Sequence, residues 1–304
     1  MESVGKMKKV LITGGTGFIG SQVVAELLRK GYEVHSLVYP PFAPEQPHLV
    51  QHEMNLMDDK AVDAFLAENS FDTLIHLAWF TGAKCHSSDV NLDWMRASIA
   101  LLESFVKHGG KTFLGAGTVS EYDFSKGYLR EDITPLANPS LYGQAKAAVY
   151  NTGRIFAKAH DVAFKWARIF NLYGPNEKPT RLMPSVLHSM LAGEDVKVSD
   201  CVKIQDYSHV FDTAAAIVAF LESDVTGAVN ICSGNPIRLR AIVEKMAELT
   251  GFKGKILWGA IPANFDDPFV VGDNTRLTRE VGYHHKYDLE TGLKQIIDWE
   301  KNHV

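Results

Sequence analysis

The sequence predicts an α/β fold in which a doubly wound parallel sheet carries a smaller, mostly helical C-terminal region. Between residues 9 and 170, short apolar runs alternate with helical patterns, which is typical of a parallel sheet covered on both faces. A glycine-rich turn joins the first run to the first helical pattern. After residue 171 the alternation ends, and three closely spaced prolines precede helix-like segments (Pro175, Pro179 and Pro184).

The elements follow in chain order. An apolar run at 9–13 predicts the first strand, and the helix expected at 21–30 is stopped by Gly31. Further short apolar runs predict strands at 33–38, 49–54, 72–78, 112–116 and 163–170. Between these strands we expect an amphipathic helix near 61–68 and long helices at about 92–108 and 141–159. The helix-like segments of the C-terminal region are 183–191, 212–221, 239–250 and 289–301.

Composition indicates an ordinary soluble protein. Of the 304 residues, 46% are hydrophobic and 22% are charged, and no apolar run approaches the roughly 18 residues that span a bilayer. The net charge of −5 provides no basic surface for nucleic acid or for an anionic membrane. The three cysteines (Cys85, Cys201 and Cys232) are widely spaced and form no CxxC pair. We therefore expect free thiols, a cytoplasmic location and no metal site.

The turn after the first strand has the pattern of a dinucleotide site. It runs Thr13-Gly-Gly-Thr-Gly-Phe-Ile-Gly20 and opens directly into a helix. Glycines in this context allow a tight turn, a close approach of the backbone to a pyrophosphate, and close packing of helix on strand. The free N–H groups of the helix N-terminus favour phosphate, whereas a turn that binds nothing is the alternative. The expected cofactor contacts here are Gly14, Gly17, Phe18, Ile19 and Gly20.

This motif sets the expected domain organisation. Residues 7–171 are expected to form a Rossmann-type dinucleotide-binding domain, completed by about 204–232. Residues 172–203 and 233–304 are expected to form the substrate-binding region.

The end of the second strand leaves the choice between NAD and NADP open. An acidic residue that would hold the adenosine ribose is expected about 20 residues after the turn, but Val38 stands there, followed by Tyr39. No Lys or Arg occurs between residues 31 and 59 to hold a 2′-phosphate, so the polar candidates are His35, Ser36 and Tyr39. The missing carboxylate favours NADP slightly. Three further residues are expected beside the cofactor: Asn55, Leu56 and Ala78.

A tyrosine and a lysine four residues apart open the second long helix. Tyr142 and Lys146 share one helix face, so the ammonium can lower the pKa of the phenol, which is near 10 when unperturbed, and can hold the nicotinamide ribose. By itself this spacing is common in helices. Thr118, at the carboxyl edge of the fifth strand, is a third candidate, because ligands bind at that edge of open α/β sheets.

In this combination the chain resembles the extended short-chain dehydrogenases/reductases of the NAD-dependent epimerase/dehydratase family. The resemblance covers roughly residues 8–300 and also includes Leu74-Ile-His-Leu-Ala78, Arg168-Ile-Phe-Asn-Leu-Tyr-Gly-Pro175, Gln205-Asp-Tyr-Ser-His-Val-Phe-Asp212 and Asn230-Ile-Cys-Ser-Gly234. Gln205 replaces the arginine that is usual in the third segment.

The resemblance implies a substrate that is a sugar carried by a nucleoside diphosphate. It implies that Thr118, Tyr142 and Lys146 are the catalytic residues. The substrate is expected to contact Trp79, Thr118, Asn171 and Arg181, with Asn171 at the diphosphate. It also implies a homodimer through the helices at 92–108 and 141–159, for which burial within the monomer is the alternative.

Three reactions compete within this family: 4-epimerisation, 4,6-dehydration, and one-way reduction or oxidation; a 3,5-epimerase/reductase is considered beside them. A dehydratase would carry Thr-Asp-Glu, whereas Thr118 is followed by Val-Ser, and Glu121 comes one position late. Cys85-His86 could supply the second acid/base pair of a 3,5-epimerase, although an ordinary polar loop is the simpler interpretation. The segments 79–89 and 115–123 favour a 4-keto-6-deoxysugar reductase over a 4-epimerase, with Trp79 and Phe80 as apolar walls for the sugar. A non-catalytic cofactor sensor is a further alternative.

Overall fold

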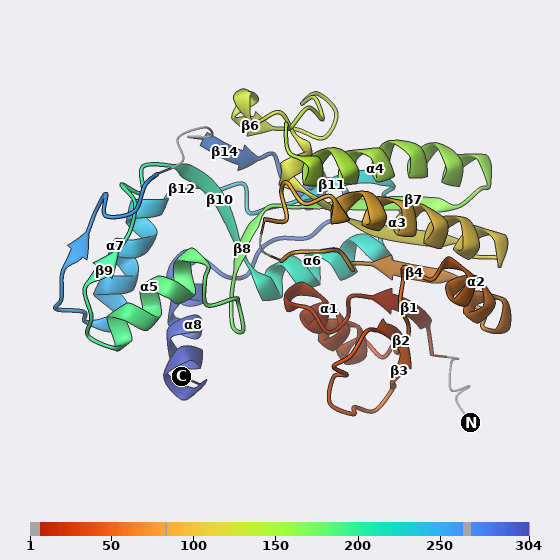
Figure 1. Cartoon of the computed structure of the whole chain (residues 1–304), viewed down its shortest axis with the longest axis horizontal. Helices are drawn as coiled ribbons and strands as arrows, with labels where there is room; N and C mark the ends of the chain where they lie inside the picture. Colours follow the sequence, from red (N-terminus) through yellow and green to blue (C-terminus); the bar gives the residue numbers. More distant parts are fainter. Residues whose placement is uncertain (1–6, 83, 264–268, 304) are drawn as a thin grey trace.

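The computed structural model describes residues 7–82, 84–263 and 269–303. Its main sheet has seven strands, all parallel, in the order β11-β7-β5-β4-β1-β2-β3 (Figure 1). The strands are β1 (Lys9–Thr13), β2 (Glu33–Val38), β3 (Leu49–Glu53), β4 (Thr73–His76), β5 (Thr112–Thr118), β7 (Ala163–Ile169) and β11 (Gly227–Ile231). The order reverses beside β1, so the carboxyl ends of β1 and β4 border the crevice in which ligands bind to such sheets.

Helices cover both faces of the sheet, as the sequence predicts. Alternate residues of one strand enter different clusters: Leu11 packs toward α2 (Asp59–Glu68), α3 (Val90–Lys107) and α4 (Leu141–Ala159). Val10 and Ile12 pack toward the opposite layer of α1 (Phe18–Arg29) and α6 (Val210–Glu222). The two layers are seen on either side of the sheet in Figure 1.

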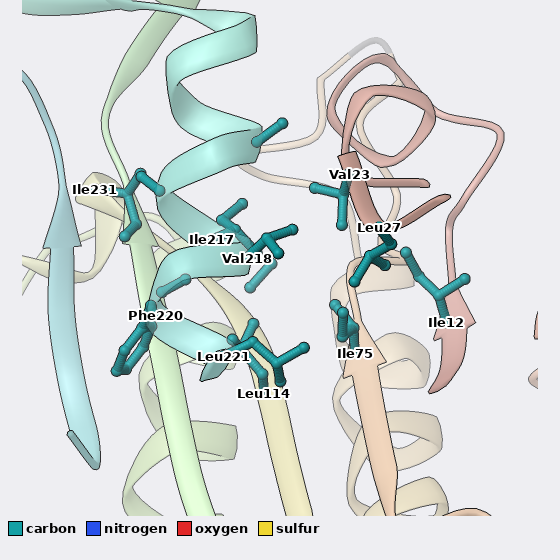
Figure 2. Packing of buried hydrophobic residues seen from close by; sticks show 14 of the residues in the cluster. Ile12, Val23, Leu27, Ile75, Leu114, Ile217, Val218, Phe220, Leu221 and Ile231 are labelled. Carbon is teal, nitrogen blue, oxygen red and sulfur yellow. The ribbon is translucent and has the colours of Figure 1, made fainter. Parts of the chain in front are cut away.

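The layer of α1 and α6 is held by aliphatic packing. Val23 and Leu27 of α1 face Val218 and Leu221 of α6 above the strands, as Figure 2 shows. All four side chains are buried. Burying a side chain of this size stabilises the fold by about 1.5–3 kcal/mol, so this contact anchors the helix that begins at the glycine-rich turn.

The described part of the C-terminal region contains three of the expected α-helices. It also contains most strands of a second sheet that the sequence did not predict, while one strand of that sheet comes from residues 128–129. The helices are α5 (Leu182–Leu191), α7 (Leu239–Thr250) and α8 (Leu289–His303). The second sheet has the order β12-β10-β14-β6, with β8 also paired to β10, and a separate pair joins β9 and β13. These strands are β6 (Tyr128–Leu129), β8 (Asn171–Tyr173), β9 (Val196–Lys197), β10 (Ile204–His209), β12 (Pro236–Arg238), β13 (Ile256–Leu257) and β14 (Phe269–Gly272).

Several boundaries differ from the expected ones. The helix expected from residue 21 begins at Phe18, so the last glycine of the turn lies inside its first turn. β5 continues to Thr118, two residues beyond its expected end, and β4 is shorter than the expected 72–78. Within the described residues, no helix is long and apolar enough to cross a membrane. No cluster of three or more potential metal ligands was found in the same part of the chain.

Candidate active site

The glycine-rich turn is tightly packed against the end of β4. Gly14 has φ of +73°, and a Cβ atom on it would lie 2.6 Å from the backbone nitrogen of Ala78. A Cβ atom on Gly20 would overlap the carbonyl oxygen of Gly14. Helix α1 then begins at Phe18 without a side-chain cap, so its first N–H groups remain available to a ligand. This turn fits the pyrophosphate of a dinucleotide, because it combines close backbone approach with free donors at a positive helix end.

A buried chain of hydrogen bonds connects this turn to helix α3. Thr13 Oγ1 and His76 Nδ1 are 2.7 Å apart, and His76 Nε2 and Ser98 Oγ are 2.8 Å apart. Ser98 Oγ also donates to the Trp94 carbonyl at 2.7 Å, and the backbone N–H of Ala78 donates to Thr13 Oγ1 at 3.3 Å. Burial lowers the pKa of His76 to about 3, so its imidazole is neutral. The chain therefore fixes the positions of the β1 and β4 ends relative to α3.

On the adenosine side, only one of the three expected polar candidates lines the cavity. His35 is buried and hydrogen-bonded to His52 and Glu33, and Ser36 is buried beneath the turn. Tyr39 lies at the cavity and is 72% exposed. The suggestion that His35 and Ser36 could contact a 2′-phosphate is thus wrong, because β2 is buried on both faces and neither side chain lines the cavity.

Helix α4 places Tyr142 and Lys146 at the carboxyl edge of β5. Ser140 caps the helix by accepting a hydrogen bond from the Gly143 N–H at 3.1 Å. A Cβ atom on Gly143 would overlap the Ser120 carbonyl, so only glycine allows the helix to start this close to the Thr118 strand end. Lys146 Nζ donates to the Ala116 carbonyl at 2.8 Å.

The pKa values of Tyr142 and Lys146 differ from what the sequence predicts. Burial raises the pKa of Tyr142 to about 12, while hydrogen bonding with Thr118 and the charge of Arg181 act in the opposite direction. Lys146 was expected to lower the Tyr142 pKa, but burial lowers the pKa of Lys146 itself to about 7. Among the charges that act on the Tyr142 pKa, Glu121 raises it and Arg181 lowers it, and the phenol is protonated at neutral pH.

Glu121, considered above for a dehydratase, is directed away from the cavity. It is fully buried, and its Oε1 accepts hydrogen bonds from the Thr118 N–H and the Trp166 indole, both at 2.9 Å. Its Oε2 accepts one from Arg168 Nε at 2.8 Å, which forms a buried ion pair. Arg168 in turn donates to Tyr122 Oη at 3.0 Å. This network fixes the backbone that carries Thr118.

The substrate side contains charged residues that the sequence analysis did not select. Lys178 Nζ donates to the Thr81 carbonyl at 2.7 Å and joins two loops at the cavity. Burial raises the pKa of the Glu177 carboxyl to about 7, and the nearby Arg181 opposes that rise. These residues lie in an irregular segment with no periodic pattern. Their position in the chain is the one signal that could have indicated them, since they follow β8, which begins at Asn171.

All fifteen site residues expected from the sequence line one cavity of about 840 Å³. They are Gly14, Gly17, Phe18, Ile19, Gly20, Tyr39, Asn55, Leu56, Ala78, Trp79, Thr118, Tyr142, Lys146, Asn171 and Arg181. Cys85, His86, Glu177, Lys178 and Tyr207 line it as well, whereas Phe80, expected as a second apolar wall, does not. A second cavity of about 320 Å³ shares Leu182 with the first and is bordered by Lys197 and Lys203.

Comparison with known proteins identifies the family. The sequence model of the NAD dependent epimerase/dehydratase family matches residues 10–232, and the chain belongs to this family. The chain is 26% identical to a UDP-glucose 4-epimerase of Bacillus subtilis (strain 168), covering 97% of each chain. It is 28% identical to a dTDP-6-deoxy-L-talose 4-dehydrogenase (NAD(+)) of Aggregatibacter actinomycetemcomitans, covering 86% of this chain and 98% of the relative. The solved structure of MoeE5 with UDP-glucuronic acid and NAD is 26% identical, with a TM-score of 0.85 over 97% of this chain and all of the other.

Proposed function

We propose that the protein reduces a 4-keto-6-deoxy sugar, carried by a nucleoside diphosphate, at C4 with NAD(P)H. The observation that carries this proposal is Tyr142, which is held as a phenol beside Thr118 in the cavity that also contains the dinucleotide turn. A phenol is the acid form that reduction of a carbonyl requires. The relative that acts on a dTDP-6-deoxy sugar as a 4-dehydrogenase supports this chemistry.

In the proposed reaction, Thr118 Oγ1 and Tyr142 Oη bind the carbonyl oxygen at C4. When bound, a reduced nicotinamide supplies the hydride that forms the new C–H bond. Tyr142 donates its proton to the oxygen, which becomes the hydroxyl, and regains a proton from solvent. Lys146 holds the nicotinamide ribose, while Asn171 and Arg181 bind the diphosphate. Trp79 is the apolar wall that suits the 6-methyl group.

The cofactor turn and its uncapped helix fit either dinucleotide, and we propose a slight preference for NADP. Among the described residues that line the cavity beside Val38 and Tyr39, none carries a carboxylate that would repel a 2′-phosphate. Titration of the protein with NADH and NADPH measures this preference as a ratio of dissociation constants.

The pH dependence of the reaction is expected to follow Lys146. Its ammonium is charged below a pKa of about 7 and is lost above it, so kcat/KM for the dinucleotide should fall as pH rises through about 7. The quantity to measure is kcat/KM between pH 5.5 and 9. Lys146→Arg should move the alkaline decline upward, because guanidinium stays protonated. An unchanged decline in this variant would contradict the assignment to Lys146.

A 4-epimerase is the second candidate, favoured by the UDP-glucose 4-epimerase that matches 97% of this chain. An epimerase oxidises and re-reduces the same sugar, so it retains its nicotinamide, whereas a reductase exchanges it in every cycle. The absent ribose carboxylate removes a charge-assisted bond worth about 1.5–3 kcal/mol, or about tenfold or more in affinity.

We therefore expect the protein to purify largely free of dinucleotide and to oxidise added NAD(P)H stoichiometrically with a 4-keto sugar. The measurements are absorbance of the released cofactor after denaturation and of NAD(P)H during turnover. If the purified protein is saturated with NAD⁺ and interconverts UDP-hexoses without added cofactor, the result would contradict the reductase proposal and favour the epimerase. Absence of any turnover with tight dinucleotide binding would favour the non-catalytic sensor instead.

We propose that the protein is a homodimer through α3 and α4, which pack against each other on one face of the sheet (Figure 1). Leu101, Leu102 and Phe105 are buried within the monomer, but Ile155 on α4 is 62% exposed. Light scattering at micromolar concentration should give the mass of a dimer, and Ile155→Lys should lower it. A monomeric mass for the unaltered protein would reject the dimer.

A further inference from the structure

Trp79, the third residue after β4, contacts both the proposed catalytic lysine and helix α3. Lys146 Nζ lies 3.9 Å from the centroid of the Trp79 ring, over its face. The Trp79 indole N–H donates to Asn91 Oδ1 at 2.9 Å. The ring of Tyr142 meets the Trp79 ring at a steep angle, with centroids 6.3 Å apart. One indole therefore connects the catalytic helix with the start of α3.

Asn91 holds this indole in a single orientation. It is fully buried, and its Nδ2 donates to the carbonyls of Cys85 at 2.6 Å and Ser88 at 2.8 Å. Its Oδ1 is thereby left to accept from Trp79. Rotating the amide by half a turn would place Oδ1 against two carbonyl oxygens, so the hydrogen-bond network determines its orientation. Both amide protons and the oxygen are used.

The Lys146 ammonium has few other partners. The residue is 2% exposed, and Nζ has one hydrogen-bond acceptor, the Ala116 carbonyl. A second aromatic ring, that of Trp166, lies farther from Nζ than the Trp79 ring, with 5.9 Å between Nζ and its centroid. The charge of Glu121 on the turn after β5 favours the ammonium from a greater distance, while His76 on β4 is neutral and Tyr142 on the same helix is protonated. A desolvated ammonium in this position gains most from the negative face of an aromatic ring.

We propose that the indole face of Trp79, oriented by Asn91, is the electrostatic partner that keeps the Lys146 amine protonated and fixed in the cofactor cavity. The two are positioning residues that act through Lys146. The inference rests on the proposed function only in taking Lys146 as the residue that contacts the dinucleotide. Cation–π contacts contribute about 1 kcal/mol at exposed sites and about 2 kcal/mol when desolvated, so losing this one should change the protonation equilibrium by about 5- to 30-fold.

The test is the titration of Lys146 in the free protein, followed by NMR of ¹³C-labelled lysine side chains and assigned with Lys146→Arg. Trp79→Leu should lower the midpoint by about one pH unit, because the leucine has no ring face. Trp79→Phe should restore part of the shift, since phenylalanine keeps a weaker ring face. Trp299→Leu, on α8, is the matched control and should leave the midpoint unchanged.

Two outcomes would overturn the proposal. An unchanged midpoint in Trp79→Leu would show that the ring contributes nothing to the ammonium. A raised midpoint would show that Trp79 acts by excluding water, since water admitted to the site stabilises the charge. Asn91→Ala, which frees the ring without removing it, should weaken NADH binding about 5-fold at pH 8 and less at pH 6. None of these measurements uses substrate or turnover, so a failure of the proposed reductase activity would be seen separately.

Discussion

Tyr142→Phe is expected to lower kcat by about 10²–10⁴, because it removes the only proton that the proposed mechanism transfers to the sugar oxygen. The effect should fall on turnover, since phenylalanine retains the ring that packs against Trp79 and His86. The measurement is NAD(P)H oxidation at saturating substrate, together with the dissociation constant for the dinucleotide, which should change little.

Two companion variants separate the roles around this phenol. Thr118→Ala should lower turnover without weakening the dinucleotide, whereas Lys146→Ala should weaken both. Thermal unfolding of each variant is the control for folding. If Tyr142→Phe turns over at a rate close to that of the unaltered protein, Tyr142 is not the proton donor and the proposed mechanism is wrong.

Glu121→Ala is expected to destabilise the protein by about 3–5 kcal/mol. Glu121 and Arg168 are each no more than 1% exposed, and removing the carboxylate leaves a buried guanidinium without its counter-charge. It also leaves the Trp166 indole and the Thr118 N–H without their acceptor. Urea-induced unfolding measures the loss.

The control for this prediction removes both charges. Glu121→Leu with Arg168→Met should be clearly more stable than Glu121→Ala, because no unpaired charge remains in the core. Exposed ion pairs such as Arg29–Glu26 should contribute little when broken. If Glu121→Ala lowers the free energy of unfolding no more than breaking the Arg29–Glu26 pair does, water reaches Arg168 and the prediction is wrong.

The parallel sheet and its helices were predictable because each element carries its own local pattern. α4 (Leu141–Ala159) and α7 (Leu239–Thr250) begin and end where the sequence predicts, since a capping serine starts the first and Gly251 ends the second. β5 was predicted two residues short because its glycines interrupt the apolar run. A Cβ atom on Gly115 or Gly117 would overlap the Trp166 side chain, so these glycines accommodate a tryptophan from the neighbouring strand.

What the sequence could not predict depends on contacts between distant segments. The second sheet consists of strands of two to six residues, and Gln-Asp-Tyr-Ser within β10 shows no apolar alternation. The Glu121–Arg168 pair joins residues 47 positions apart, and nothing local distinguishes its carboxylate from an exposed one. The motifs thus indicated which residues gather around the cavity. The charges that act on Tyr142 became clear only with the packing.

The hydrogen bonds through His76 allow one arrangement of protons. Ser98 gives its proton to the Trp94 carbonyl, so His76 Nε2 must donate to Ser98, and Nδ1 must accept from Thr13. The histidine is therefore locked in one tautomer. Its folded-state pKa of about 3 lies below the ordinary value of 6.5. Between these two pH values, His76 is protonated in the unfolded chain and neutral in the folded one. Protonation of His76 therefore does not reduce the free energy of unfolding above pH 6.5, but it reduces this free energy progressively as pH falls toward 3. Mild acid accordingly shifts the folding equilibrium toward the unfolded chain. In the molecules that stay folded, His76 remains neutral, so the hydrogen bonds beside the cofactor turn are kept.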